Sequence, residues 1–279
     1  MKQTNYVGGQ AVVEGVMMKN GDRIAVAVRN PNGKITVKKE KLKIKESKIP
    51  FVRGVVNLII IMYIGIKTLN YSSNAQLGKE EKIGTKEIVF SLIFALVFAI
   101  LLFKLLPLLA STFIDRAYHV NNFMFNLLDG VIKIGLFVLY IYIISLNKDV
   151  YRVFQYHGAE HKAVACYENK KKLTIKNTQK FRTEHKRCGT TFVFLVLFIS
   201  ILVYMFIPKN YDLMTKLGLR ILLLPVIASI SYELLRLGAK YSFMNIIILP
   251  GLLIQKLTTK EPDDKQVEVA IKALKAVIN

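Results

Sequence analysis

The stretch IVFSLIFALVFAILLFKLLPLLAST, residues 88–112, decides the class of protein, because its 25 residues hold one charged side chain, Lys104. A transmembrane helix needs about 20 apolar residues at a rise of about 1.5 Å per residue. Three further runs, at residues 131–147, 190–208 and 217–235, are also long and apolar enough. We therefore predict four transmembrane helices.

Two other apolar segments are marginal as spans. Residues 51–71 carry an arginine, an asparagine and a lysine, and residues 241–257 are short and are broken by Pro250 and Gly251. We expect both to be re-entrant or interfacial pieces. The predicted fold class is a mainly α-helical polytopic membrane protein with about four transmembrane helices, two re-entrant or interfacial segments and a small N-terminal β-rich cytosolic domain.

The composition supports a membrane protein. Of the 279 residues, 53% are hydrophobic and 21% are charged, at a mean hydropathy of +0.37, which excludes disordered and collagen-like chains. A net charge of +21 suits either a nucleic-acid binder or a membrane protein with basic cytosolic loops, and the long uncharged runs favour the second and give no reason to expect DNA as a partner. The two cysteines argue against a disulfide scaffold, and the polar N-terminus predicts no cleavable signal peptide.

Lysine and arginine counts predict the orientation. Residues 1–50 hold 11 of them, 148–189 hold 11 and 232–279 hold 7, whereas 113–130 hold 1 and 209–216 hold 2. The positive-inside rule then places both termini and the 148–189 loop in the cytosol, and the two short linkers outside. Four spans satisfy this alternation.

Three cations lie inside the predicted spans. Lys133 and Arg220 lie near helix ends, where long side chains snorkel to the interface, and we expect that here. Lys104 lies deeper, so a buried partner and an internal water-filled pocket both remain open for it.

We predict three parts of the chain: a membrane domain, residues 51–257, and one cytosolic part at each end. Residues 1–50 form a basic β-rich domain, because RIAVAVR (23–29) and the stretch from residue 34 alternate around the turn NPNG, and residues 8–18 add further strands. Residues 258–279 form an amphipathic helix that docks on the core or the interface, and Pro262 followed by Asp263 and Asp264 predicts its start. A lysine run in the β-rich domain suits anionic headgroups or RNA, or is a solvated strand face; it comprises Lys38, Lys39, Lys41, Lys43, Lys45 and Lys48.

The 148–189 loop holds the strongest candidate site. His157 and His161 are four residues apart and share one face of a helix, so both imidazoles can bind one metal ion, with Glu160 beside them as ligand or general base. His185 and Cys188 form a second pair at ligand spacing, and His and Cys favour zinc. We predict Glu160 as catalytic and zinc bound by His157, His161, His185 and Cys188, with no nucleotide cofactor because no phosphate-binding motif is present.

Ordinary structural roles remain open for each of these residues. The first two histidines can bond to backbone, and the His185–Cys188 pair can be a helix cap. Three further candidates have stronger alternatives: Cys166 as a small buried hydrophobe, Glu233 paired with Arg236, and Glu14 as a satisfied turn carboxylate.

Six blocks together resemble the YqhQ family of bacterial multi-pass membrane proteins, filed as a domain of unknown function and often labelled metal-dependent enzymes. The blocks are GGQAVVEGVMM (8–18), FVRGVVNL (51–58), YHGAEHKAV (156–164), HKRCGTTF (185–192), SYELLRL (231–237) and the stretch 250–274. The resemblance implies a bacterial plasma-membrane location. Family positions carry over onto Gly8, Gly9, Gln10, Glu14, Gly15, His157, Glu160, His161, His185, Arg187, Cys188, Gly189, Glu233 and Glu261 to Asp264, whereas Lys186 and Thr191 depart from the usual HPRCGTSF.

Two functions fit these observations, and the sequence does not separate them. One is a membrane-embedded, metal-dependent, hydrolase-like enzyme of unknown substrate at the cytosolic face. The other is a non-catalytic factor for membrane-protein biogenesis or assembly near the ribosome or translocon, with a structural metal site. A transporter is a third hypothesis, supported by Lys104 and the broken segment 241–257. The expected partner in every case is a bilayer with anionic headgroups.

Overall fold

The N-terminal region is a four-stranded antiparallel sheet with its strands in chain order. The computed structural model describes residues 7–43, 47–77 and 84–278, so Lys45 of the lysine run lies outside the described residues. The strands are β1 (Val7–Val12), β2 (Gly15–Asn20), β3 (Arg23–Arg29) and β4 (Ile35–Lys41). The predicted strands and the hairpin around the NPNG turn are confirmed, with Gly33 at φ +81° in that turn.

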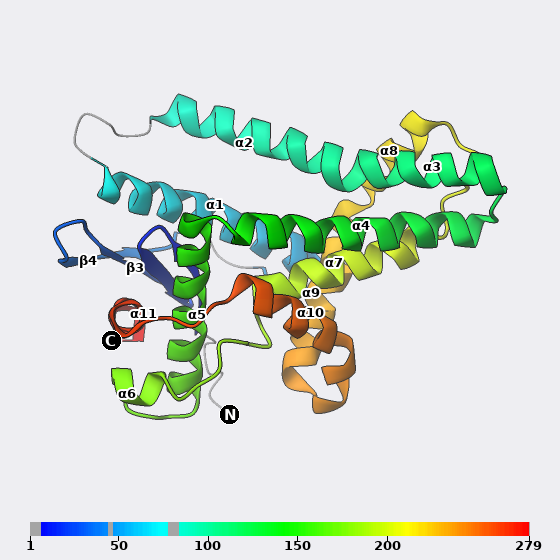
Figure 1. The fold of residues 1–279 in the computed structure, drawn as a ribbon. Helices are drawn as coiled ribbons and strands as arrows, with labels where there is room; N and C mark the ends of the chain where they lie inside the picture. The colour runs from blue at the N-terminus through cyan, green and yellow to red at the C-terminus, as the bar shows by residue number, and fades with distance from the viewer. Residues whose placement is uncertain (1–6, 44–46, 78–83, 279) are drawn as a thin grey trace.

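Both faces of this sheet are covered, which explains why RIAVAVR is buried almost throughout. Successive side chains of a strand point to opposite faces. Ala25 and Ala27 pack against α5 (Lys148–Glu168) and α11 (Asp264–Ile278), while Ile24 and Val26 pack under α1 (Val52–Gln76). Figure 1 shows the sheet between these helices.

The C-terminal helix α11 docks on the sheet and on α5, as its amphipathic pattern predicts. Asp263 and Gln266 form a reciprocal cap: the Gln266 backbone N–H donates to Asp263 Oδ1 at 2.7 Å, and the Asp263 N–H donates to Gln266 Oε1 at 2.9 Å. The helix start predicted at Pro262 is therefore explained by its side-chain cap.

Helices form the rest of the described chain. The longest is continuous over Lys86–Tyr118 and contains a π-helical segment at Leu101–Leu105. The long helix comprises α2 (Thr85–Ile100), the π-helical segment and α3 (Leu106–Tyr118). The others are α4 (Asn122–Ser145), α6 (Ile175–Thr178), α7 (Gly189–Tyr204), α8 (Leu213–Leu222), α9 (Leu224–Lys240), the 3-10 turn Ser242–Met244 and α10 (Asn245–Thr258).

Three helices of the described chain are long and apolar enough to cross a membrane: Val52–Gln76, Lys86–Tyr118 and Asn122–Ser145. The spans predicted at 88–112 and 131–147 match the second and third. The run 190–208 forms a helix of only 16 residues, and 217–235 is split between α8 and α9, which are bent by 41° at their break. Counting that bent pair as one span gives up to four.

Apart from the N-cap Phe51, residues 51–71 lie in α1, an uninterrupted helix of 25 residues, so a re-entrant break is not seen there, whereas an interfacial position stays a prediction. The polar side chains of α1, which made the segment look marginal, have partners outside the helix: Arg53 pairs with Glu233, and Lys67 Nζ lies 2.6 Å from Glu40. The buried face of α1 packs on the sheet through Ile60 and Ile64. Pairing with distant residues therefore accommodates the polar side chains of α1 within one continuous helix.

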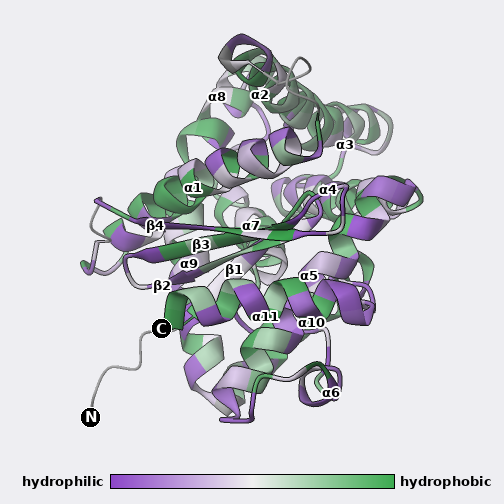
Figure 2. Cartoon of the chain, turned by 90° about the vertical axis from the view of Figure 1, so that its left-hand side faces the viewer, coloured by the Kyte–Doolittle hydropathy of each residue, from purple (hydrophilic) through white to green (hydrophobic). Residues whose placement is uncertain are grey.

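Hydropathy distinguishes the apolar helices α2 and α3 from the sheet and the helices packed on it (Figure 2). Figure 2 shows hydrophobic colour dominating α2 and α3, whereas α5, α11 and the strands mix polar and apolar residues. Along α2, large apolar side chains such as Phe90, Phe94 and Leu96 are 73%, 64% and 63% exposed.

Candidate metal centre

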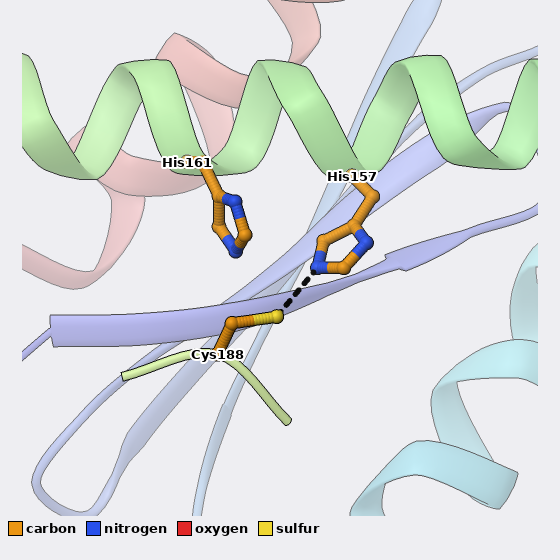
Figure 3. Close-up of side chains that lie close together, drawn as sticks. All are labelled: His157, His161 and Cys188. Atoms are coloured by element: carbon orange, nitrogen blue, oxygen red, sulfur yellow. Dashed lines mark hydrogen bonds between the residues drawn. The ribbon is translucent and has the colours of Figure 1, made fainter. Parts of the chain in front are cut away.

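Two helices and one turn bring three ligand-type side chains together. His157 and His161 project from one face of α5, and Cys188 precedes α7 (Figure 3). One ligand atom from each lies within 4.8 Å of the others, and His157 Nε2 is 3.3 Å from Cys188 Sγ. The imidazole centroids are 4.4 Å apart, as the four-residue spacing on a helix requires.

Backbone carbonyls fix both imidazoles in the tautomer that a metal needs. His157 Nδ1–H donates to the Thr258 carbonyl at 2.9 Å, and His161 Nδ1–H donates to the Thr183 carbonyl at 2.5 Å. A carbonyl only accepts, so each Nε2 keeps its lone pair. Burial lowers the pKa of His157 and of His161, so both rings are neutral near pH 7. Such outer hydrogen bonds are typical of metal-binding histidines.

Two imidazole nitrogens and one thiol sulfur form a donor set that could hold a metal ion. Zn–N and Zn–S bonds of about 2.0–2.1 and 2.3 Å place tetrahedral ligands about 3.3–3.6 Å apart. The separation of His157 Nε2 and Cys188 Sγ, 3.3 Å, is in this range, whereas the three ligand atoms as a group lie within a wider 4.8 Å, so binding would draw them together. Cys188 is the N-cap of α7 and accepts the Thr190 N–H at 3.3 Å, and a helix N-terminus suits a negatively charged ligand. His157, His161 and Cys188 would hold the ion.

Glu160 lies beside this group and is 4% exposed. Its Oε2 is 3.4 Å from His161 Nε2, and burial raises the pKa of its carboxyl. Strand β1 covers it closely: a Cβ on Gly9 would be 3.0 Å from Glu160 Cγ. Glycine at this position therefore lets the strand approach the carboxylate.

Gly158 lets α5 approach residues 258–260, the segment whose Thr258 carbonyl accepts the hydrogen bond from His157. A Cβ there would lie 2.1 Å from the Lys260 carbonyl oxygen, so only glycine allows this approach. The Lys260 N–H in turn donates to the Phe154 carbonyl at 2.9 Å. The glycine between the histidine and the glutamate of HGAEH thus keeps the Thr258 carbonyl within reach of His157.

His185 is a neighbour of the group but not a member of it. Its ring centroid is 5.6 Å from that of His161, and its Nε2 is turned to Glu168, 3.2 Å away. Glu168 also pairs with Arg187. The structure therefore places three of the four predicted ligands together and directs the fourth to a carboxylate.

The three additional candidates lie elsewhere. Glu14, at φ +49°, pairs with Arg152 and accepts the Tyr156 hydroxyl at 3.1 Å, so it ties the β1–β2 turn to α5. Glu233 pairs with Arg53 of α1 rather than with Arg236. Cys166 is fully buried near the end of α5, with its thiol 3.9 and 3.8 Å from the Lys171 and Lys172 carbonyls. Two of these match the ordinary roles considered from the sequence, and Glu233 has a different partner.

Other contributors were not found from the sequence. The Thr183 and Thr258 carbonyls are backbone groups and leave no side-chain signal. Gln255 does leave one, since it is a buried amide that follows an apolar run in α10. Its Oε1 accepts the His185 N–H and its Nε2 donates to the His185 carbonyl, both at 2.9 Å. It thereby fixes the turn that leads to Cys188.

Comparison with known proteins places this site in a family. Residues 49–279 match the family model described as "Protein of unknown function (DUF1385)", so the chain belongs to this family. The chain is 34% identical to "Uncharacterized protein YqhQ" of Bacillus subtilis (strain 168), in an alignment that covers 97% of this chain and 92% of the relative. The resemblance to the YqhQ family is confirmed. No solved structure matches the chain.

Proposed function

We propose that the chain is an integral protein of the bacterial plasma membrane with a zinc site at its cytosolic face, and that it is a metal-dependent, hydrolase-like enzyme. The observation that carries the proposal is the group His157, His161 and Cys188, with its ligand atoms within 4.8 Å and Glu160 beside it. Three protein ligands are the number found in catalytic zinc sites, which keep one position open.

Helix α8 supports the membrane location, because its charged side chains are buried and its large apolar side chains are exposed, the opposite of a helix in a water-soluble protein. Its buried side chains are Lys216 and Arg220, whereas Met214 and Leu222 are 68% and 72% exposed. In water the apolar side would face the core. Together with the exposed phenylalanines of α2, this arrangement suits surroundings of lipid.

The division of labour at the site follows from the geometry. A bound zinc ion supplies Lewis acidity. Glu160 would accept a proton at its carboxylate, and burial raises the pKa of this group, which strengthens it as a base. The Thr183 and Thr258 carbonyls hold the imidazoles in place, and β1 excludes water from one side.

A second candidate is a non-catalytic factor in membrane-protein biogenesis or assembly that acts near the ribosome or translocon with a structural metal. Burial favours it: His161 and Glu160 are 3% and 4% exposed, and Cys188 is 5% exposed. A closed site with a fourth protein ligand would be structural. Rotation of His185 away from Glu168 would supply that ligand.

Zinc content tests the site. We expect purified full-length protein to hold about one zinc per chain, and His161→Ala or Cys188→Ser to lower that content sharply, because each removes one of three ligands. The matched control is Cys166→Ser, a buried thiol outside the group. Wild-type protein without zinc, or variants that keep it in full, would contradict the proposal.

X-ray absorption at the zinc edge separates the two functions. We expect two nitrogen donors from imidazole and one sulfur, with the remaining donor from outside the protein. A third imidazole, lost in His185→Ala, would instead support the structural site and the assembly factor.

Cysteine labelling tests the orientation. Ala117→Cys and Tyr211→Cys are expected to react with a membrane-impermeant thiol reagent on intact cells, and Lys39→Cys and Lys171→Cys are not, in line with the positive-inside rule. All four positions are exposed, and both native cysteines are buried. Asn122 bonds to the Met205 carbonyl at 2.9 Å and to the Lys209 N–H at 2.7 Å, so the two linkers share one end of the bundle. Labelling of Lys171→Cys in intact cells would contradict this orientation and place the 148–189 loop outside the cell.

A further inference from the structure

A second polar cluster lies in the helical bundle, separate from the histidine group. It joins the π-helical segment, α4, α7 and α8 around the ring of Tyr204: Lys104 Nζ, Lys133 Nζ and the Arg220 guanidinium carbon lie 5.2, 4.8 and 5.0 Å from the ring centroid. Asp129 completes it. Lys133 and Asp129 are each 1% exposed, as is Arg220, so the expected snorkelling of Lys133 and Arg220 is wrong.

The cluster holds more positive than negative charge. Asp129 Oδ2 accepts from Lys133 at 3.0 Å and Asp129 Oδ1 accepts from Arg220 at 2.5 Å, so both carboxylate oxygens are in use. Lys104 reaches only the Tyr204 hydroxyl, at 2.9 Å, among the contacts of the described residues. Three basic side chains share one carboxylate, and an excess of positive charge is costly in a buried position.

The cluster also contains hydrogen-bond donors that lack an acceptor. Arg220 Nε is buried and has no hydrogen-bond partner within the described chain. The Tyr204 hydroxyl donates to the Arg220 carbonyl at 2.9 Å, so it accepts from Lys104 and has no proton left for another acceptor. Arginine and lysine donors with no acceptor are the groups that recognise oxyanions.

The cluster also has an approach. Lys104 is half-buried and is the least buried of the three cations. Lys216 lies one turn before Arg220 on the buried face of α8 and donates to the Lys209 carbonyl at 3.1 Å, in the linker between α7 and α8. A line of cations therefore runs from that linker to the cluster. The π-helical turn at Lys104 is a further sign of function, since such turns are frequent at functional sites.

We propose that the cluster of Lys104, Lys133 and Arg220 binds the dianionic phosphate of inorganic phosphate or of a phosphomonoester headgroup. A phosphate monoester carries a charge of about −1.5 to −2 at pH 7, which offsets the excess of positive charge in the cluster. Its oxygens accept from Lys104 and from Arg220 Nε, the donors that lack a carboxylate partner. Asp129 positions Lys133 and Arg220 and does not touch the ligand.

Thermal unfolding of the full-length protein in an uncharged maltoside detergent tests this. Inorganic phosphate is expected to raise Tm by about 5–10 °C at a hundred times its dissociation constant, and chloride at equal ionic strength is not. Lys104→Met is expected to weaken phosphate binding about 10- to 100-fold through loss of a charged hydrogen bond, and Lys104→Arg to retain binding. The control is Lys86→Met, an exposed lysine of the same helix, with wild-type binding.

A second arm identifies the source of the phosphate. Phosphatidic acid, a phosphomonoester lipid, is added to the micelles and its retention is measured by native mass spectrometry, with phosphatidylcholine as the diester control. Retention that depends on Lys104 supports the proposal with a lipid headgroup as the ligand, and release by inorganic phosphate supports a shared site. No response to either probe, or equal binding by Lys104→Met, would overturn it. Zinc content is measured separately, so either proposal can fail alone.

Discussion

Glu160→Gln is expected to give a folded protein that keeps its zinc and fails to complement a deletion strain. Glutamine retains the size and one carbonyl acceptor of the glutamate but does not accept a proton, and general-base catalysis contributes about 10²–10⁴-fold in rate. The side chain is 3.4 Å from His161 Nε2 and is not among the grouped ligands, so the ion should remain. Complementation and zinc content of the purified variant are the measurements.

The control for this experiment is Glu261→Gln, which alters a carboxylate that is 74% exposed and paired with Lys162. We expect it to complement fully. If Glu160→Gln loses zinc affinity by about 10- to 100-fold, Glu160 orients His161 instead of moving a proton. Full complementation with zinc retained would remove the enzyme hypothesis and leave the assembly factor.

Local patterns predicted the parts of this fold that depend on near neighbours. The alternation of RIAVAVR and its turn predicted the hairpin, and the residues after Pro262 predicted the start of α11. Helical spacing likewise predicted that His157 and His161 share a face of α5. Each of these features is determined by residues within about one helical turn or one hairpin, so the sequence alone was sufficient.

Pairing over long distances could not be predicted in this way. Arg53 and Glu233 are 180 residues apart, and Asp129 and Arg220 are 91 apart. Taken alone, Arg220 is a cation near the end of an apolar run, and snorkelling was the reasonable interpretation. Asp129, its distant partner, makes that interpretation wrong, because a cation paired with a carboxylate is tolerated in the interior. The same holds for His185, whose ligand spacing to Cys188 is overridden by Glu168.

The largest effect on stability is expected from Asp129→Asn. Removing one partner of a buried charge pair costs about 3–5 kcal/mol, because the remaining charges stay buried without compensation. Asp129 is the carboxylate partner of both Lys133 and Arg220, and all three are 1% exposed. For a chain of this size the loss corresponds to a Tm lower by about 6–20 °C, measured by thermal unfolding in detergent.

Asp115→Asn is the matched control, since Asp115 pairs with Lys209 in the same bundle but both side chains are 25% exposed. Half-exposed pairs contribute at most about 1 kcal/mol, so Tm should change by only a few degrees. Adding Lys133→Gln to Asp129→Asn removes one of the uncompensated cations and should recover part of the loss. If the phosphate site exists, saturating inorganic phosphate should also narrow the gap between Asp129→Asn and wild type, because a bound dianion replaces the missing negative charge. Equal Tm values for Asp129→Asn and Asp115→Asn would mean that α4 and α8 are held together by packing and not by this carboxylate.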